Sequence, residues 1–410
     1  MVTLKATGIV VEYNPFHNGH LHHVQEAKKR TGADVMIAVM SGNFLQRGEP
    51  AFVDKWTRAE MALRSGVDLV FELPYRFATA NAPLFAKGAI KLLDAAHCCA
   101  YCFGSEDGSI QPFLDSLELI EQHRDSYDEA VKEAMASGVS YPKALNMAYI
   151  QVLASSQKME PPVDLAKPNN ILGYHYMEAA RDLHSQMIPV TIPRIVAQYH
   201  DDAIAGNAIA SATGIRKTFF SSASLEEVSG FLPEATEHLL HNWQQERSVF
   251  GSWDYFYPYL RLIIVREGPS RLASIADIVE GMENAIYKAA LSNQTFGAFM
   301  EQIKSKRYTW TRIQRMITHI LTGFTSSLRD DITEPSYLRL LGMTSKGKDY
   351  LNRTKKELKL PLISKVASYQ DLSLSADIRA SDIYALGIAQ KSGNAKLGLD
   401  YLNRPLILES

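Results

Sequence analysis

Two histidines, His17 and His20, flank a glycine in the tetrapeptide His17-Asn18-Gly19-His20. The tetrapeptide follows a short apolar run and opens an amphipathic stretch, which predicts a strand, a loop and the first turn of a helix. Free N–H groups and the helix dipole favour an anion at such a helix start, and Gly19 leaves room for its close approach. We therefore predict a phosphate site at this loop.

The two imidazoles suggest what happens to the phosphate. They can donate hydrogen bonds to oxygens whose charge changes as pyrophosphate leaves, so His17 and His20 are the predicted catalytic residues for attack on the α-phosphate of ATP. No covalent enzyme intermediate is needed. The alternative is that both histidines merely cap a helix, but their place directly after the first predicted strand favours the functional interpretation.

A second, cationic clamp is expected for the departing pyrophosphate. The best candidate is the stretch from Ile209 to Lys217, where Ser211 or Thr213 could cap a helix and also contact a phosphate. Arg216, or Lys217, would balance the charge. Taken alone the stretch is an ordinary capped helix start, so this prediction depends on the histidine motif.

Strands and helices must position these residues, and the chain shows alternating short apolar runs and amphipathic stretches. The pattern predicts strands at residues 7–13, 34–40, 68–73, 98–103 and 190–192, with helices at about 19–29, 56–65, 83–93 and through 110–160. Right-handed crossovers then give a Rossmann-like α/β domain with an open parallel sheet, whose ligands lie at the carboxyl ends of its strands. This domain is expected to span residues 1–225, and residues 226–410 to form a mainly α-helical domain, with helices near 275–291, 310–321 and 381–389.

Composition sets limits on partners and metals. The chain has 43 Lys and Arg against 45 Asp and Glu, so an RNA partner would have to be held by a local basic face. Cys99 and Cys102 have CxxC spacing but lack the second pair that a zinc site needs, so no metal site is predicted. No export signal and no membrane-spanning run is recognisable, and a cytoplasmic protein without a membrane partner is expected.

Several longer motifs carry a resemblance to a known family. They are residues 12–20 (Glu-Tyr-Asn-Pro-Phe-His-Asn-Gly-His), 40–50 (Met-Ser-Gly-Asn-Phe-Leu-Gln-Arg-Gly-Glu-Pro), 103–106 (Phe-Gly-Ser-Glu), 168–173 (Pro-Asn-Asn-Ile-Leu-Gly) and 305–308 (Ser-Lys-Arg-Tyr). Together they resemble the tRNA(Met) cytidine acetate ligases, within the HxGH nucleotidyltransferase superfamily. Tyr13-Asn14-Pro15, in place of the Phe-Asp-Pro of many adenylyltransferases, agrees with this resemblance.

The resemblance implies a reaction in two steps. ATP activates acetate as acetyl-adenylate, and the acetyl group then passes to the wobble cytidine of elongator tRNA(Met), giving N4-acetylcytidine, AMP and pyrophosphate. The α/β domain would bind ATP and acetate, and the helical domain the tRNA. Mg²⁺ is expected to arrive with the nucleotide, since no carboxylate cluster marks a dedicated site.

The family's ATP-binding residues, carried over by motif, cover the first strand and the histidine loop and three downstream positions. They are Thr7, Gly8, Ile9, Val10, Val11, Glu12, Tyr13, Asn14, Pro15, Phe16, His17, Asn18, Gly19, His20, Gly104, Asn170 and Arg194. At the Asn169-Asn170 pair, Asn170 is preferred, although either residue could simply cap a helix.

The loop from Ser41 to Gly48 is the expected acetate pocket. Acetate is a small anion that needs one or two donors, which Asn43, Gln46 or Arg47 could supply. A surface loop held by its own side-chain hydrogen bonds remains the alternative for any one of them.

A basic stretch near residue 310 is the expected tRNA contact. Its candidate phosphate-binding residues are Lys304, Lys306, Arg307, Arg312 and Arg315. In the predicted helix, Arg312, Arg315 and His319 face away from an apolar stripe, and Tyr308 or Trp310 could stack on an unpaired base. A solvated basic helix face is the alternative.

Two other functions remain open from the sequence. One is an adenylyltransferase that moves AMP onto a small phosphorylated metabolite, which would leave the basic stretch unexplained. The other is a nucleotide-sensing RNA-binding protein without turnover, which would bind ATP and tRNA but form no acetylated nucleoside.

Overall fold

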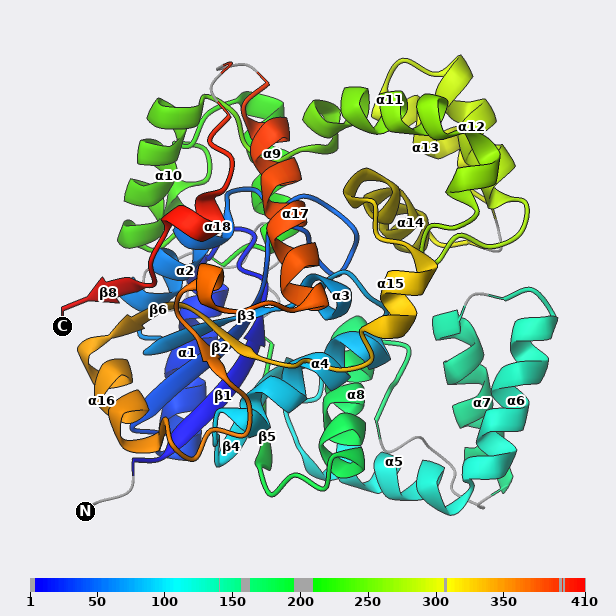
Figure 1. Cartoon of the computed structure of the whole chain (residues 1–410). Helices are drawn as coiled ribbons and strands as arrows, with labels where there is room; N and C mark the ends of the chain where they lie inside the picture. The colour runs from blue at the N-terminus through cyan, green and yellow to red at the C-terminus, as the bar shows by residue number, and fades with distance from the viewer. Residues whose placement is uncertain are drawn as a thin grey trace.

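A mixed sheet forms the centre of the computed structural model (Figure 1), which describes residues 4–139, 141–155, 163–194, 209–305, 308–390, 393 and 395–409. The strands lie in the order β5-β4-β1-β2-β3-β6-β7, and β8 also pairs with β6. Their bounds are β1 Ala6–Val11, β2 Val35–Ser41, β3 Leu69–Leu73, β4 Ala100–Ser105, β5 Ile188–Pro193, β6 Leu338–Thr344, β7 Leu362–Ile363 and β8 Leu406–Leu408. The described pairings are parallel except for β3 with β6.

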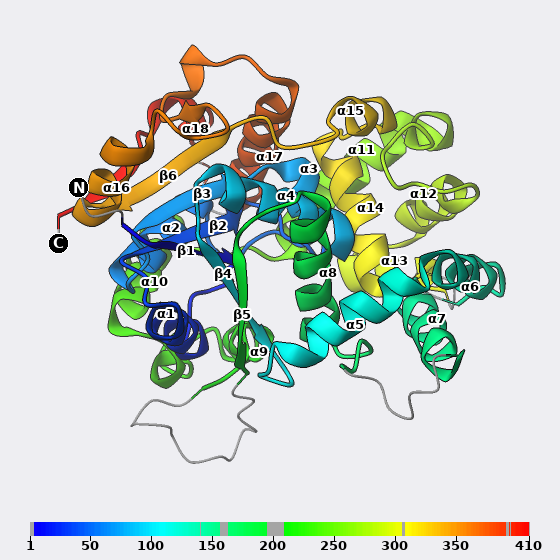
Figure 2. The ribbon, with the colours of Figure 1, turned by 90° about the horizontal axis from the view of Figure 1, so that it is seen from below.

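Helices cover both faces of this sheet. The first group is α1 Asn18–Thr31, α2 Lys55–Arg64, α3 Tyr75–Ala78, α4 Ala82–Ala95, α5 Gln111–Gln122, α6 Arg124–Ala136, α7 Tyr141–Ser155, α8 Pro168–Asp182 and α9 Ala212–Ser222. Helix α1 contacts β1, β4 and β5, whereas α4 and α8 pack together on the opposite face, as Figure 2 shows. These positions follow from right-handed crossovers whose direction reverses after β3.

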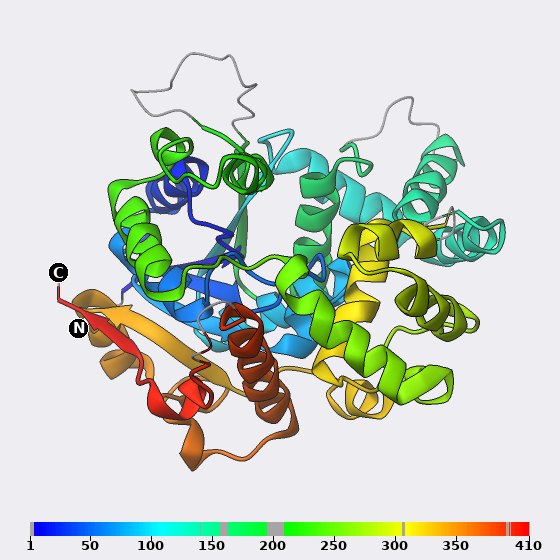
Figure 3. The same cartoon turned by 90° about the horizontal axis from the view of Figure 1, so that it is seen from above.

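The later helices are α10 Glu234–Arg247, α11 Trp253–Leu272, α12 Met282–Ser292, α13 Phe296–Ile303, α14 Trp310–Thr322, α15 Ser326–Asp331, α16 Ser345–Thr354, α17 Leu372–Ile388 and α18 Leu399–Leu402, with short 3₁₀ turns at Ser229–Phe231 and Val366–Ser368. Of these, α11 to α14 pack on one another beside the sheet, whereas α16 packs on β6 and α10 packs on α2. Figure 3 shows α11 to α14 gathered on one side of the molecule. Of the helices described, none is long and apolar enough to cross a bilayer.

The predicted α/β fold is confirmed, and each of the five predicted strands is present. The later strands were not predicted: β6, β7 and β8 come from residues 226–410, which were expected to be helical, and β6 runs antiparallel to β3. The physical reason lies in β6 itself, where Arg339 interrupts the apolar run yet is fully buried. A charged residue inside a buried strand interrupts the apolar run by which such a strand is recognised in the sequence.

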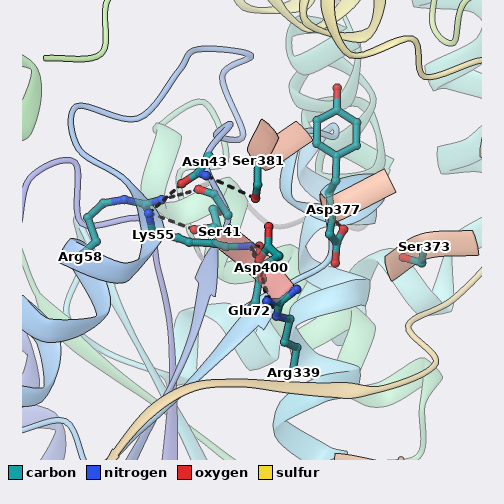
Figure 4. Close-up of polar contacts among 12 residues, drawn as sticks. Ser41, Asn43, Lys55, Arg58, Glu72, Arg339, Ser373, Asp377, Ser381 and Asp400 are labelled. Atoms are coloured by element: carbon teal, nitrogen blue, oxygen red, sulfur yellow. Dashed lines mark hydrogen bonds and ion pairs between the residues drawn. The ribbon is translucent and has the colours of Figure 1, made fainter. Parts of the chain in front are cut away.

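Arg339 belongs to a buried cluster of four charges (Figure 4), which we call the ion cluster: Lys55, Glu72, Arg339 and Asp400. Lys55 Nζ lies 2.8 Å from Glu72 Oε1 and 2.7 Å from Asp400 Oδ1. Arg339 Nη2 lies 2.6 Å from Asp400 Oδ1, and its Nε 3.3 Å from Glu72 Oε2. Burial alone would raise the pKa of Asp400, but Lys55 and Arg339 hold it below its usual value. Two positive and two negative groups thus join α2, β3, β6 and α18.

We predict that Asp400→Asn strongly destabilises the fold, because it leaves the buried Lys55 and Arg339 with one carboxylate. Removing one partner of a buried ion pair costs about 3–5 kcal/mol. Thermal and urea unfolding followed by circular dichroism would measure the loss. The matched control is Asp349→Asn, which breaks a surface pair with Arg353 and should cost less than about 1 kcal/mol. Equal stability of the two variants would contradict the prediction.

Candidate active site

The histidine loop forms the N-terminus of α1 as a reciprocal cap. His17 is the N-cap residue, and its Nδ1 accepts a hydrogen bond of 3.0 Å from the backbone N–H of Gly19. His20 Nδ1 in turn accepts from the backbone N–H of His17 at 3.3 Å. The two imidazoles stack with centroids 3.8 Å apart, and the rings of Tyr13 and Phe16 pack against His20. The loop is therefore fixed before any ligand binds.

These contacts also determine where each imidazole carries its proton. A ring nitrogen that accepts a hydrogen bond holds a lone pair, so the proton of a neutral imidazole must lie on Nε2. Burial lowers the pKa of His17 to about 3, with the charge of Arg194 adding to the effect. Burial and the neighbouring His17 lower the pKa of His20 well below its usual value. Both side chains are thus neutral donors that present Nε2–H groups.

The first part of the predicted ATP stretch has a positioning role. Thr7 to Val11 form β1, which lies between β4 and β2 in the sheet. A Cβ on Gly8 would clash with Leu93 of α4, so this glycine allows close packing of a helix on the strand. Glu12 follows the strand, and its buried carboxylate accepts the backbone N–H of Gln46 at 2.7 Å.

The ends of β4 and β5 bring the downstream ATP-binding candidates to the same edge of the sheet. Gly104 lies near the end of β4, and a Cβ there would be only 3.2 Å from Cγ of Arg194. Arg194 follows β5 and donates to Oδ1 of Asn169. Its charge acts on His17 and His20, which places it near the histidine loop.

Within the Asn169-Asn170 pair, the two side chains have different surroundings. Asn170 is fully buried, and its amide is used by Asp107 Oδ2, Asp164 O and the backbone N–H of Glu106. Asn169 is partly exposed and contacts Arg194 and Glu106. The preferred residue Asn170 thus holds the loop after β4, and Asn169 is the member beside Arg194.

The predicted phosphate clamp also lies beside the histidine loop. Ser211 is the N-cap of α9 and accepts from the backbone N–H of Gly214, while Thr213 is exposed. Ile209, just before this cap, lies 3.5 Å from the Cβ position of Gly19. The N-termini of α1 and α9 are therefore adjacent.

Arg216 connects the clamp helix to the loop after β1. Its guanidinium donates to the carbonyl of Asn14 at 2.7 Å and pairs with Glu49 at 2.9 Å. The side chain of Asn14 binds the backbone N–H of Phe52 at 2.6 Å. Arg216 thus has carbonyl and carboxylate partners in the protein without nucleotide.

The candidates for the acetate pocket have different surroundings. Asn43 is buried, and its amide binds the backbone N–H of Lys55 and the hydroxyl of Ser381, so it faces α17 (Figure 4). Gln46 contacts Glu12 through its backbone, and Arg47 is exposed. Gln46 and Arg47 thus lie beside the end of β1, whereas Asn43 has partners on α2 and α17.

The predicted tRNA residues lie in and before α14. Lys304 Nζ lies 5.8 Å from the Trp310 ring and the Arg312 guanidinium 4.9 Å from the Tyr308 ring, so a cation covers each aromatic ring. Arg315 donates to the carbonyl of Gln46 at 3.4 Å. Lys306 and Arg307 lie outside the described residues.

The expectation that His319 faces the solvent with these arginines is wrong. Its side chain is 3% exposed, and its Nδ1 lies 2.9 Å from the hydroxyl of Tyr75. Burial lowers its pKa. The α14 helix is buried on more than its apolar stripe, because the loop ending at Gly48 packs directly on its backbone.

One buried arginine that sequence reasoning missed holds the site together. Arg58 of α2 donates to the carbonyls of Glu12 at 2.7 Å, Ser41 at 3.0 Å and Val53 at 3.1 Å, and also to that of Gly42. It thereby joins the carboxyl ends of β1 and β2. The available signal was its spacing from Lys55, which puts two basic residues on the inner face of one predicted helix.

The chain is similar to known proteins over almost its whole length. The model of the HIGH Nucleotidyl Transferase family matches residues 4–397. A protein of Lysinibacillus sphaericus named tRNA(Met) cytidine acetate ligase is 54% identical over 404 residues, covering 98% of this chain and 100% of the relative. The Bacillus subtilis protein of that name is 45% identical over 396 residues, covering 94% and 93%.

A solved structure shows the same likeness in three dimensions. The crystal structure of Thermotoga maritima TmcAL bound with alpha-thio ATP is 31% identical, with a TM-score of 0.90, and the match covers 99% of this chain and 100% of that one. Fold and motif thus define a HIGH nucleotidyl transferase. Within that class, this chain belongs to the family of the tRNA(Met) cytidine acetate ligases, which confirms the resemblance found in the sequence.

We predict that Gly19→Ala slows the reaction with ATP without unfolding the protein. The new Cβ would lie 2.9 Å from Cε1 of His17 and 3.1 Å from its Nδ1, so the imidazole must move from its capping position. Displacing a reacting group by about 1 Å costs roughly a hundredfold in rate. ATP–pyrophosphate exchange would measure the loss. The matched control is Gly297→Ala on α13, where a Cβ meets nothing within 4 Å; an equal loss in both variants would refute the explanation.

A second prediction concerns pH. Because burial lowers the pKa values of His17 and His20, the folded protein binds fewer protons than the unfolded chain below the ordinary histidine pKa of 6.5. Their contribution to stability is then complete above about pH 6.5 and is lost as pH falls towards the folded values. In histidine-labelled, nucleotide-free protein, the Cε1 resonances of these residues should not shift between about pH 8 and pH 5.5. A midpoint near pH 6.5, as in urea-unfolded protein, would contradict this.

Proposed function

We propose that this chain is an ATP-dependent ligase that converts acetate to acetyl-adenylate and transfers the acetyl group to the wobble cytidine of elongator tRNA(Met). The single observation that carries the proposal is the pair of stacked histidines at the α1 N-terminus, whose Nδ1 atoms accept backbone hydrogen bonds so that each neutral ring carries its proton on Nε2. The acceptor of the acetyl group is inferred from the family, because the relatives of this chain are named tRNA(Met) cytidine acetate ligases.

In the first step, an acetate oxygen attacks the α-phosphorus of ATP, the P–O bond to the β-phosphate breaks, and pyrophosphate leaves. His17 and His20 donate Nε2–H hydrogen bonds to oxygens that gain charge, without giving up their protons. Neutral donors suit this step, because the imidazoles have no positive charge that must be desolvated. Arg194, with Asn169 beside it, supplies positive charge at the same edge of the sheet.

The leaving pyrophosphate is proposed to bind at the N-terminus of α9. The free N–H groups there and the hydroxyls of Ser211 and Thr213 can donate hydrogen bonds to its oxygens. Arg216 would exchange its bonds to Asn14 and Glu49 for phosphate oxygens. Mg²⁺ would be carried in by the phosphates, since in the part of the chain that is described no group of three acidic, histidine or cysteine side chains is arranged to hold a metal ion.

In the second step, the exocyclic amine of cytidine attacks the acetyl carbon, the bond to AMP breaks, and the amine loses a proton. Acetate and acetyl are proposed to lie near Gln46 and Arg47, which follow β2 beside Glu12. Lys304, Arg312 and Arg315, with Lys306 and Arg307, are the proposed contacts to tRNA phosphates.

The proposal predicts acetate-dependent ATP–pyrophosphate exchange and N4-acetylcytidine in tRNA(Met) after incubation with ATP and labelled acetate. Mass analysis of the digested tRNA would detect the nucleoside. His20→Ala should reduce both signals by roughly 10²–10³, the usual cost of a lost transition-state donor, with tRNA binding retained. Exchange that ignores acetate and requires a phosphorylated metabolite would instead identify an adenylyltransferase. Binding of ATP and tRNA without exchange or product would identify a non-catalytic sensor.

A further inference from the structure

Three arginines from separate helices converge on one carboxylate, Asp277, in the turn between α11 and α12. They are Arg76 of α3, Arg315 of α14 and Arg329 of α15, and we call them the arginine cluster. Arg329 Nη1 lies 4.0 Å from Asp277 Oδ1, and His319 Nε2 lies 3.7 Å from Asp277 Oδ2. Burial alone would raise the pKa of Asp277, but its contact with His319, followed by the charges of Arg315 and Arg76, lowers it.

The arginine cluster carries more positive charge than its surroundings balance. Asp330 pairs with Arg329 at 2.9 Å, is two-thirds exposed, and its charge also acts on Arg76. Asp277 acts on both Arg76 and Arg315. Burial lowers the pKa of His319, so this histidine adds no charge at neutral pH. Among these described groups three arginines therefore face two aspartates, which leaves one positive charge in excess.

Two donors of the arginine cluster also have no acceptor. The Nε atoms of Arg76 and Arg315 are both buried, and neither has a hydrogen-bond partner within the described ranges. Buried donors are almost always hydrogen-bonded, because leaving one unpaired costs its full desolvation energy. Two such donors beside an unbalanced charge indicate a site that an anion completes.

The arginine cluster lies close to the candidate active site. Arg315 donates to the carbonyl of Gln46, and the backbone N–H of the same Gln46 binds Glu12, which follows β1. Arg76 lies on α3, which follows β3 at the same edge of the sheet. Gln46 thus connects Arg315 of the cluster to Glu12, which directly follows the strand that leads into the histidine loop.

We propose that Arg76 and Arg315 bind a backbone phosphate of the RNA substrate, which takes the place of Asp277 as their counter-ion. Guanidinium groups pair with phosphate oxygens through two parallel N–H donors, and both arginine residues remain partly exposed. Arg312 of α14 and Lys304, which follows α13, extend the positive charge, as a polynucleotide requires and a free anion does not. This inference rests on the proposed function for its ligand, and it adds Arg76, a residue that no motif marked.

The test compares Arg76→Gln with Arg266→Gln, which removes one exposed arginine of α11. Affinity for tRNA(Met) is measured by fluorescence anisotropy at several salt concentrations. Arg76→Gln should weaken binding about tenfold and reduce the salt slope by about one unit, since one phosphate contact is lost. Arg266→Gln should change neither quantity. Wild-type affinity and slope in a folded Arg76→Gln protein would overturn the inference.

Asp277→Asn separates a binding role from a structural one. If Asp277 competes with RNA for the guanidiniums, removing its charge should tighten tRNA binding, whereas loss of a merely structural contact would weaken it. Inorganic phosphate is the second arm: if it raises the melting temperature of wild type but not of Arg76→Gln while both bind tRNA equally, the site takes a free anion and the inference fails. Acetate-dependent exchange by wild type tests the proposed function separately, because the tRNA-binding results do not depend on it.

Discussion

The buried ion cluster is the constraint on which the candidate active site depends. Lys55 of α2 pairs with Glu72 of β3, and Arg339 and Asp400 join this pair from far along the chain to complete a cluster of two positive and two negative groups. The position of α2 in turn places Arg58, which holds the carboxyl ends of β1 and β2. The histidine loop follows directly from β1. Residues distant from the reaction therefore set the geometry of the groups that perform it.

Charge is distributed unevenly between the two parts of the molecule that the reaction would use. At the histidine loop, burial keeps both imidazoles neutral, and their protons are placed by backbone hydrogen bonds. Around α14, by contrast, positive charge exceeds what nearby carboxylates balance. A neutral donor pair suits a small reacting centre that closes around ATP, whereas excess charge suits a large polyanion that remains partly hydrated. The near-zero net charge of the chain conceals this division.

Sequence reasoning succeeded where the signal was local. The loop at His17–His20, the five parallel strands and the capping role of Ser211 each depend on a short pattern, and the structure has all of them. It failed where a distant partner decides the outcome. Arg339 looked unsuitable for a strand until Glu72 and Asp400 balanced its charge. The amide of Asn43 binds Ser381 and Lys55, partners that no local pattern around this residue indicates. His319 matched a solvent-facing position until Tyr75 and Asp277 covered it.

The distance along the chain between Lys55 and Asp400 has a consequence for synthesis on the ribosome. Lys55 and Glu72 emerge early, but Asp400 is translated only after the helices that carry the arginine cluster. Until then Lys55 and Arg339 share the single carboxylate of Glu72, so the buried cluster carries one uncompensated positive charge. Stable packing around the ATP site therefore requires a residue that is made after the proposed RNA-binding helices, and a chain that ends before Asp400 should be less stable and more open to proteolysis.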